Sequence, residues 1–170
     1  MKQGTVSVLV GCHSPIHSLL VIRAWHALCG HWPVPWEATC VFLHDIGHWG
    51  KDYLNDPEQK RLHWQLGARL AQRFFGERGW YLTAGHDGGS GFAKSLLYRA
   101  DKLSWWYAPT WWLWANTVTE PKLMTGYSRR EAIRLFREQV KESILSGDYR
   151  PTHEFYLERC GKIGKGRDGE

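Results

Sequence analysis

The sequence predicts an all-α fold built as one main domain. Several segments carry apolar residues at the spacing of an amphipathic helix, and many of them begin at Ser or Pro and end at Gly. Only residues 4–10 alternate like a strand, so we expect no sheet. The chain has 170 residues, which is enough for one domain with a core and too few for two domains of typical size.

The first third of the chain is expected to hold an extended lead-in and two helices. Residues 1–12 are predicted to be extended. A Ser-Pro pair and a later glycine predict a helix over residues 14–28, because Ser caps a helix, Pro fits its first turn and Gly ends it. A second helix is expected over residues 36–47, with His44 and Asp45 on its last turn.

The middle third is expected to hold two helices joined by a glycine-rich loop. The helix over residues 61–75 is predicted from an apolar residue at every fourth position, namely Leu62, Leu66, Leu70 and Phe74. A turn at residues 76–79 and a short apolar stretch lead into the loop at residues 85–91. The next helix is expected over residues 92–107, with Asp101 beside its apolar face.

The last third is expected to add helices to this core. Residues 110–118 are rich in Trp and are expected to be helical, and further helices are expected over residues 128–145 and 151–160. We therefore expect a core domain at residues 13–107, a helical extension packed on it at residues 108–160, and a flexible basic tail at residues 161–170.

Charge and tryptophan content bear on the partners of the chain. The net charge of +5 favours anionic ligands such as nucleotides, and it is too small and scattered to indicate specific nucleic-acid binding. The eleven Trp residues are expected to be largely buried or else to form a sticky surface. For the Trp cluster at residues 105–114, core packing or a homodimer interface is the default, and a wall that stacks a nucleobase is the functional alternative.

Cysteine spacing and hydropathy bear on the compartment. The four Cys residues are isolated and form no C-x-x-C pair, which argues against a thiolate zinc site and against a disulfide scaffold. No segment approaches the length of about 18 uncharged apolar residues that spans a membrane. The short apolar run near the N-terminus does not have the features of a signal peptide. We therefore expect a cytoplasmic protein with reduced thiols and no membrane association.

Six polar residues lie on otherwise apolar stretches: His17, His44, Asp45, His63, His86 and Asp101. A buried His or Asp is costly unless it has a partner, and a divalent cation is a partner for both. One such His alone is more often a core residue, and the His-Asp pair alone is more often a hydrogen-bonded helix end than a metal site. Six on successive segments favour a metal site, and N/O donors without thiolate suit Fe, Mn, Co or Ni at least as well as Zn.

Three motifs resemble those of the HD-domain metal-dependent phosphohydrolases. They are HSLLVIRAW around His17, VFLHDIG around His44 and Asp45, and LLYRADKLS around Asp101, and the resemblance covers roughly residues 13–107. HWQLGARLA and LTAGHDGG match in order the two further His ligands that two-metal members carry. Within the family, the pattern is similar to that of bacterial HD-domain dinucleoside-tetraphosphate hydrolases.

The resemblance implies a helical bundle that cleaves a phosphate ester or anhydride of a nucleotide, whether a mono- or triphosphate or a dinucleoside polyphosphate. It implies one or two divalent transition metals (Fe, Mn, Co, Ni or Zn) that activate water to the attacking hydroxide. One metal would be held by His17, His44, Asp45 and Asp101. With two metals, Asp45 would bridge them, and His63 and His86 would bind the second.

Other roles follow from position relative to these motifs. His48 is a candidate catalytic proton donor to the leaving oxygen, and a solvated loop histidine is the alternative. Lys51, Lys94 and Lys102 are candidates to bind substrate phosphates, although such lysines are more often solvated. His13, one turn before His17, is interpreted as a capping or exposed residue rather than a pocket residue.

Two alternatives to a phosphohydrolase stay open at this point. Some relatives with the same six-ligand scaffold carry out O₂ chemistry, so an HD-type di-iron oxygenase is the second hypothesis. The third is a non-catalytic HD-like domain that binds a nucleotide or a protein partner. Six retained metal ligands argue against the third, since a pure binding module does not need them.

Overall fold

The prediction of an all-α fold is confirmed. The computed structural model describes residues 2–52, 56–120 and 126–147, and it contains helices and no strand over those ranges. The elements in chain order are α1 (Gln3–Val10), α2 (Pro15–Cys29), α3 (Pro35–Leu43), η1 (Ile46–His48), α4 (Pro57–Arg61), α5 (Trp64–Phe75), α6 (Glu77–Ala84), α7 (Leu96–Ser104), η2 (Trp105–Tyr107), α8 (Thr110–Thr119) and α9 (Arg129–Ser146).

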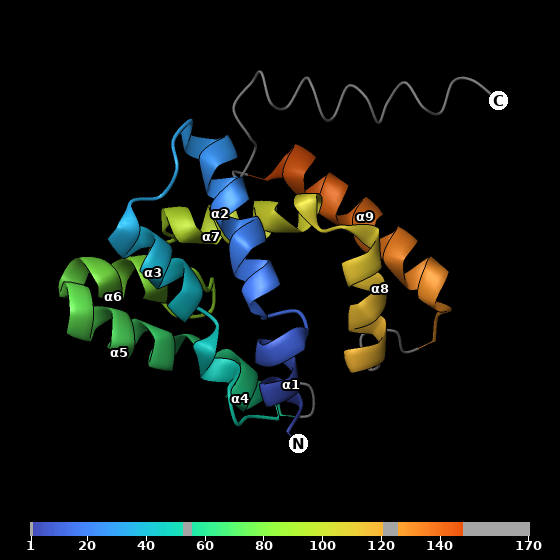
Figure 1. Cartoon of the computed structure of the whole chain (residues 1–170), viewed down its shortest axis with the longest axis horizontal. Coiled ribbons are helices and arrows are strands. Elements are labelled where there is room, and N and C mark those ends of the chain that lie inside the picture. The colour runs from blue at the N-terminus through green and yellow to red at the C-terminus, as the bar shows by residue number, and fades with distance from the viewer. Residues whose placement is uncertain (1, 53–55, 121–125, 148–170) are drawn as a thin grey trace.

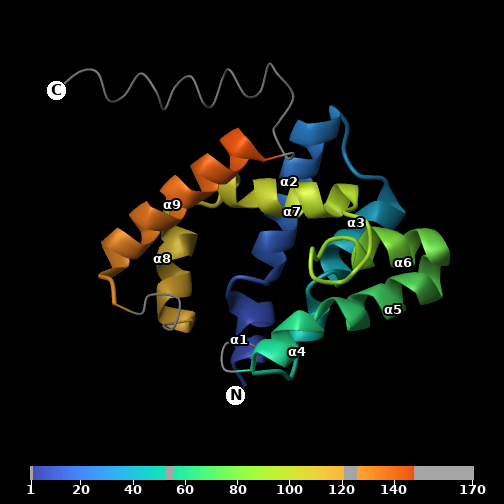
Figure 2. The ribbon, with the colours of Figure 1, turned by 180° about the vertical axis from the view of Figure 1, so that it is seen from behind.

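Helix α2 runs through the middle of the molecule, and the other helices lie on either side of it. Helices α3, α5 and α6 form one side, α8 and α9 form the other, and α1 and α4 lie below (Figure 1). Helix α7 crosses α2 and packs against it, as the view from behind shows (Figure 2). The crossing of α2 and α7 places one ligand candidate from each helix near the centre of the fold.

The expectation of an extended lead-in is wrong, because residues Gln3–Val10 form helix α1. A short run of β-branched apolar residues does not by itself distinguish a strand from a helix. Tertiary contacts decide the outcome: the Gly4 amide donates to the carbonyl of Lys51, and Ser7 is fully buried. Leu9 and Val10 remain about half exposed, so α1 is held by its polar inner face.

Helix α2 has nearly the bounds that the sequence predicts, although Ser14, the expected cap, makes no side-chain capping hydrogen bond. It begins at Pro15 and ends before Gly30, whose φ of 74° is the left-handed conformation that ends many helices. Helix α9 also matches, because Ser128 and Glu131 form a capping box at its start. These ends were predictable since the residues that set them are adjacent in sequence.

Helix α3 ends four residues earlier than expected. It stops at Leu43, and a tight turn and the short helix η1 follow, so His44 and Asp45 lie just past the helix and not on its last turn. The turn is needed because α5 passes very close to it. A Cβ on Gly47 would lie 1.6 Å from the carbonyl oxygen of His63, which no other residue type allows.

The buried face of α5 differs from the predicted one. The large apolar residues at every fourth position lie on its flank, and Leu66 and Phe74 are 45% and 65% exposed. The buried residues are mostly small: Trp64, Gly67, Ala68 and Ala71. The reason is close packing, since a Cβ on Gly67 would lie 2.3 Å from the carbonyl oxygen of Leu43.

Two other boundaries also differ from expectation. The expected turn at residues 76–79 and the apolar stretch after it form one helix, α6. The helix expected over residues 92–107 begins only at Leu96, and its last part is the separate short helix η2. Residues 151–160 and the tail at 161–170 lie outside the described residues.

The buried apolar residues form clusters that link the helices. The largest joins α2, α3, α7 and Ile144 of α9. A second cluster joins Trp112 and Leu113 of α8 to Ile16 and Leu20 of α2, with part of α9 against it. Helices α8 and α9 therefore pack against the apolar core to which α2 contributes.

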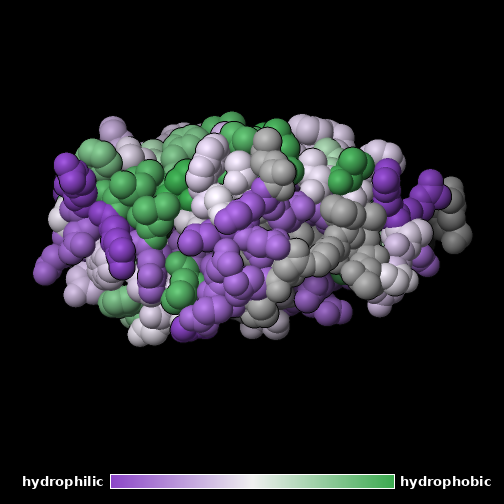
Figure 3. Space-filling view, turned by 90° about the horizontal axis from the view of Figure 1, so that it is seen from below, coloured by the Kyte–Doolittle hydropathy of each residue, from purple (hydrophilic) through white to green (hydrophobic). Residues whose placement is uncertain are grey.

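The tryptophans divide between the core and the surface. Trp25, Trp64 and Trp112 are buried, whereas the side chains of Trp32, Trp49, Trp111 and Trp114 are about half exposed or more, so general burial is not observed. Hydrophilic residues crowd the middle of the face seen in Figure 3, and apolar residues gather beside them.

Within the described ranges no single helix has the length and apolarity to cross a membrane, although α1 and α2, bent by 55°, meet that test as a pair.

Candidate metal centre

The six ligand candidates from the sequence converge on one place in the fold. They come from α2 (His17), the turn after α3 (His44 and Asp45), the residue before α5 (His63), the turn after α6 (His86) and α7 (Asp101). Five of them are at most 7% exposed, and His63 is partly buried. Polar residues from five segments therefore share a small volume that excludes most water.

One group of donors surrounds a single oxygen of Asp45. The Nε2 atoms of His17 and His44 lie 3.5 Å and 3.0 Å from Asp45 Oδ2. Asp101 completes this group, because its Oδ1 lies 3.0 Å from His17 Nε2 and 3.9 Å from His44 Nε2. Two imidazoles and two carboxylates thus aim their donor atoms at a common point.

A second group surrounds the other oxygen of Asp45. The Nε2 atoms of His63 and His86 each lie 3.6 Å from Asp45 Oδ1 and 3.0 Å from one another. The donor atoms of His17, His44 and Asp101 lie within 4.8 Å of one another, close enough to hold one metal ion. The same is true of the donor atoms of Asp45, His63 and His86. Asp45 therefore stands between two donor sets, with one oxygen directed at each.

The backbone fixes how three of these histidines are protonated. Each Nδ1 lies within hydrogen-bond distance of the carbonyl oxygen three residues earlier, in the pairs His44–Val41, His63–Lys60 and His86–Thr83. A carbonyl only accepts, so each Nδ1 must carry the proton and donate it. In the neutral ring the lone pair is then on Nε2, which faces the centre, as it does in histidines that bind metals.

These protonation states make the centre fit a cation. Two Nε2 lone pairs 3.0 Å apart, on His63 and His86, repel one another unless a proton or a metal ion lies between them. Burial lowers the pKa of His63, which disfavours the proton. His44 Nε2 is buried 3.0 Å from Asp45 Oδ2, and a lone pair on this nitrogen would repel the carboxylate oxygen unless a proton or a metal ion lies between them. The buried His and Asp groups could therefore hold a metal ion, as the sequence predicts in outline.

Opposite charges keep the two carboxylates ionised inside the protein. Burial alone would raise the pKa of Asp45, but the charge of His44 and its hydrogen bond to Asp45 outweigh burial and hold that pKa well below its usual range. Burial would likewise raise the pKa of Asp101, but Lys102 and His17 outweigh burial and hold that pKa below its usual range. Both carboxylates thus stay negative and available as ligands.

His13 and His48 form a third group with Asp45, and sequence reasoning missed His13. The His48 ring lies between two others, with centroids 4.0 Å from His13 and 4.4 Å from His63. Burial and His13 hold the pKa of His48 far below its usual range, so the ring is neutral. The role of proton donor to a leaving group stays a prediction that this neutral state does not favour. The spacing of one helical turn between His13 and His17 was the sequence signal that could have identified His13 as a site residue.

A hydrogen-bond chain orients His13 from the far side. Ser7 Oγ donates to Oε1 of the fully buried Glu120 at 2.8 Å and lies 2.6 Å from His13 Nδ1. Since the single hydroxyl proton goes to the carboxylate, Ser7 must accept from His13 Nδ1, which leaves the His13 lone pair on Nε2. Burial lowers the pKa of His13 to about 4, so this ring is also neutral near pH 7.

Comparison with known proteins adds no relative. No protein-family model matches the chain, and neither a curated protein nor a solved structure is similar enough to count as a match. The resemblance to HD-domain phosphohydrolases thus rests on the sequence motifs, and the geometry of the donors stands independently of it.

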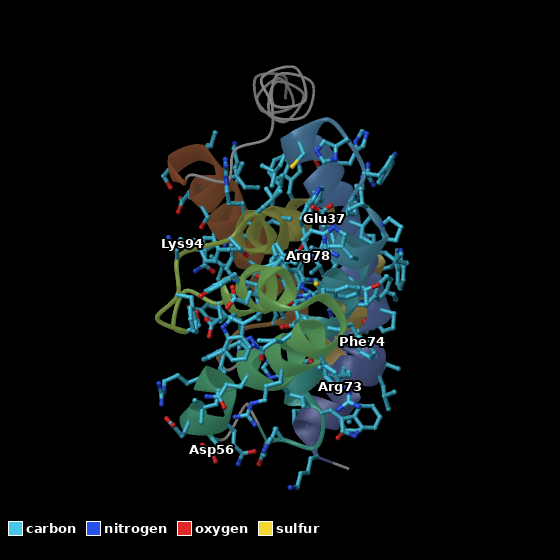
Figure 4. The ribbon with its side chains drawn as sticks, turned by 90° about the vertical axis from the view of Figure 1, so that its left-hand side faces the viewer. Glu37, Asp56, Arg73, Phe74, Arg78 and Lys94 are labelled. Atoms are coloured by element: carbon cyan, nitrogen blue, oxygen red, sulfur yellow. The ribbon has the colours of Figure 1, made fainter. Side chains whose placement is uncertain are left out.

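The three lysine candidates lie at different distances from the centre. Lys102 Nζ forms an ion pair of 2.8 Å with Asp101 Oδ2, which raises the pKa of the lysine. Lys94 lies at the outer edge of the glycine-rich loop, over the ring of Tyr98 at 4.6 Å (Figure 4). Lys51 is exposed beside η1. The structure brings Lys102 to the centre and leaves the other two at the surface.

Proposed function

We propose that the chain is an HD-type metal-dependent phosphohydrolase that cleaves a phosphate ester or anhydride of a nucleotide. The position of Asp45 carries the proposal, because its two oxygens face two separate sets of imidazole and carboxylate donors. The order of the donors along the chain, His, His-Asp, His, His, Asp, is also that of the family motifs. Cytoplasmic location and a homodimer through the Trp-rich segment stay predictions.

The donor set supports one or two divalent transition metals. His17, His44 and Asp101 would hold one, His63 and His86 the other, and Asp45 would contact both. When bound, such ions polarise a phosphoryl group and lower the pKa of coordinated water. The N/O donors suit Fe, Mn, Co, Ni or Zn, and the described part of the chain places no thiolate among them.

The surrounding residues would orient a phosphate and limit water access. Lys102 is partly exposed while its ammonium contacts Asp101, so it stands where the buried centre opens to solvent. A cation there would bind phosphate oxygens as they approach. His48, neutral and held between two rings, would fix the position of a bound water or phosphate oxygen through a hydrogen bond and not through its charge.

A phosphate-release screen tests this proposal. Protein purified without chelator and loaded with Mn, Fe, Co or Ni should release phosphate from at least one nucleoside mono-, di- or triphosphate or dinucleoside polyphosphate, under air and under argon alike. Turnover that requires O₂ and iron would instead favour the di-iron oxygenase. If the protein binds none of these metals and hydrolyses none of these substrates, the hypothesis of a non-catalytic HD-like domain is favoured.

A further inference from the structure

A cavity of about 270 Å³ lies directly beside the metal centre, between α8, α9 and the turn after α1. It shares two walls with the centre: His13, and Trp105, whose ring stacks on His17 with centroids 5.0 Å apart. Much of the remaining wall is apolar, with Leu113 from α8 and Ile133 and Phe136 from α9. A ligand held at the centre therefore has an apolar chamber next to it.

One polar side chain in this apolar chamber has no protein partner. Asn116 lines the cavity and is 3% exposed, and neither its Nδ2 nor its Oδ1 has a hydrogen-bond partner among the described residues. Burying a carboxamide without hydrogen bonds is costly, and Asn is a poor residue for the middle of a helix. The position is therefore explained best by a ligand that supplies both an acceptor and a donor.

We propose that this cavity binds the nucleobase of the substrate, with the Asn116 carboxamide pairing with adjacent donor and acceptor atoms on the edge of the base. The inference rests on the proposed function, since it assigns the base of the nucleotide whose phosphate would bind at the centre. An Asn carboxamide forms two such hydrogen bonds to an adenine edge in nucleic-acid complexes. Among nucleobases, adenine therefore fits this chemistry directly.

The size and walls of the cavity agree with a single ring system. Its volume is slightly below the range of about 300–1,000 Å³ that pockets for whole drug-sized ligands occupy. A base therefore fits inside while the sugar and phosphate remain toward His13 and the metal centre. Trp105 stacks on both His17 and Trp112, so it acts as a shared wall and not as an open stacking platform.

Binding of nucleosides tests the assignment without metal or turnover. Adenosine, guanosine, cytidine and uridine are titrated into the full chain by calorimetry, together with purine riboside, which lacks the exocyclic group of adenosine. We expect adenosine to bind and purine riboside to bind about tenfold more weakly. Asn116→Leu should weaken the binding of adenosine by a similar factor. Thr117→Val should not weaken it, because the Thr117 hydroxyl donates to the Trp114 carbonyl within α8.

Asn116→Leu also gives a stability measurement that separates a binding role from a structural one. An unpaired buried amide replaced by an apolar side chain of similar size should leave Tm equal or higher. A clear fall in Tm would show that Asn116 has a structural partner and would overturn the proposal. Equal binding of adenosine by wild type and Asn116→Leu, or no nucleoside binding at all, would also overturn it.

Kinetics separate this inference from the proposed function. If the chain hydrolyses a nucleotide, Asn116→Leu should raise its KM relative to the KM for ribose 5-phosphate, which has no base. Phosphate release with an unchanged KM ratio would overturn the base pocket and leave the phosphohydrolase in place. Adenosine binding that depends on Asn116, in a chain that hydrolyses nothing, would support the pocket and refute the phosphohydrolase.

Discussion

Asp45 is the residue on which both donor groups of the centre depend. Its Oδ2 contacts His17 and His44, and its Oδ1 contacts His63 and His86. A buried carboxylate in this position needs compensating positive charge, and part of that charge in the metal-free protein comes from a protonated His44. Burial opposes protonation of His44, but Asp45 and Asp101 outweigh it and raise its pKa to about 9.

The pKa of His44 predicts that metal binding displaces a proton. Below about pH 9 the Nε2 of His44 is protonated in the metal-free protein and must lose this proton to coordinate a metal. Affinity for Mn²⁺ or Co²⁺ should therefore rise about tenfold from pH 7 to pH 8 and level off above pH 9. Calorimetry in two buffers of different ionisation enthalpy should detect about one proton released per bound ion near pH 7. An affinity that does not change over this range would contradict the assignment of His44.

At the scale of elements, the centre depends on how closely the turn after α3 approaches α5. Gly47 and Gly67 allow this approach from two sides, because a side chain on either would overlap a backbone carbonyl of the neighbouring segment. The same contact positions His63 against Asp45 Oδ1. The glycine of the HDIG motif therefore has a packing reason that is visible in the structure.

Replacing Gly47 should damage one half of the centre more than the other. Gly47→Ala places a Cβ against the His63 carbonyl and should destabilise the protein by about 1–3 kcal/mol in urea denaturation. It should also weaken the ion held by His63 and His86 more than the ion held by His17 and His44. Gly88→Ala is the control, because its Cβ meets only Tyr98 at 3.6 Å. Equal stability of the two variants would show that the close approach is not required.

Helix ends set by adjacent residues could be predicted from the sequence, and contacts between distant segments could not. The starts of α2 at Pro15 and of α9 after Ser128 are set by neighbouring residues, and both lie where the sequence predicts them, although Ser14 makes no side-chain capping hydrogen bond. The helical state of α1 and the buried face of α5 depend on the segments that pack against them. Propensity and spacing therefore predicted an extended segment in place of α1 and the wrong buried face for α5. Among site residues, Glu120 and Asn116 were missed because their role depends on where α8 lies relative to α1 and α2.

At the scale of the whole molecule, the donors join segments that are far apart in sequence. His17 and Asp101 come from the crossing helices α2 and α7, and the remaining donors come from the side formed by α3, α5 and α6. The packing of α8 and α9 on α2 then adds the cavity next to the centre. A bound metal would therefore connect most of the fold, and its effect on stability should be global.

Metal binding should raise the thermal stability of the whole chain. A ligand at about 100 times its Kd that binds only the folded state stabilises by about 2.7 kcal/mol, which corresponds to a Tm increase of about 5–10 °C for a domain of this size. Scanning calorimetry with and without Mn²⁺ measures this, and excess chelator should reverse it. An unchanged Tm in metal-saturated protein would contradict a centre that links these segments.

The most direct test of the centre is its metal content. Protein purified without chelator should carry one or two transition-metal ions per chain, measured by mass spectrometry of the metals. Asp45→Ala should lose them, because both donor groups contact Asp45. Asp87→Ala is a matched control from the other His-Asp pair of the chain, since the Asp87 carboxylate accepts from the Gly89 amide in the loop. Wild-type metal content in Asp45→Ala would contradict the account, and its loss in Asp45→Ala alone is the predicted result.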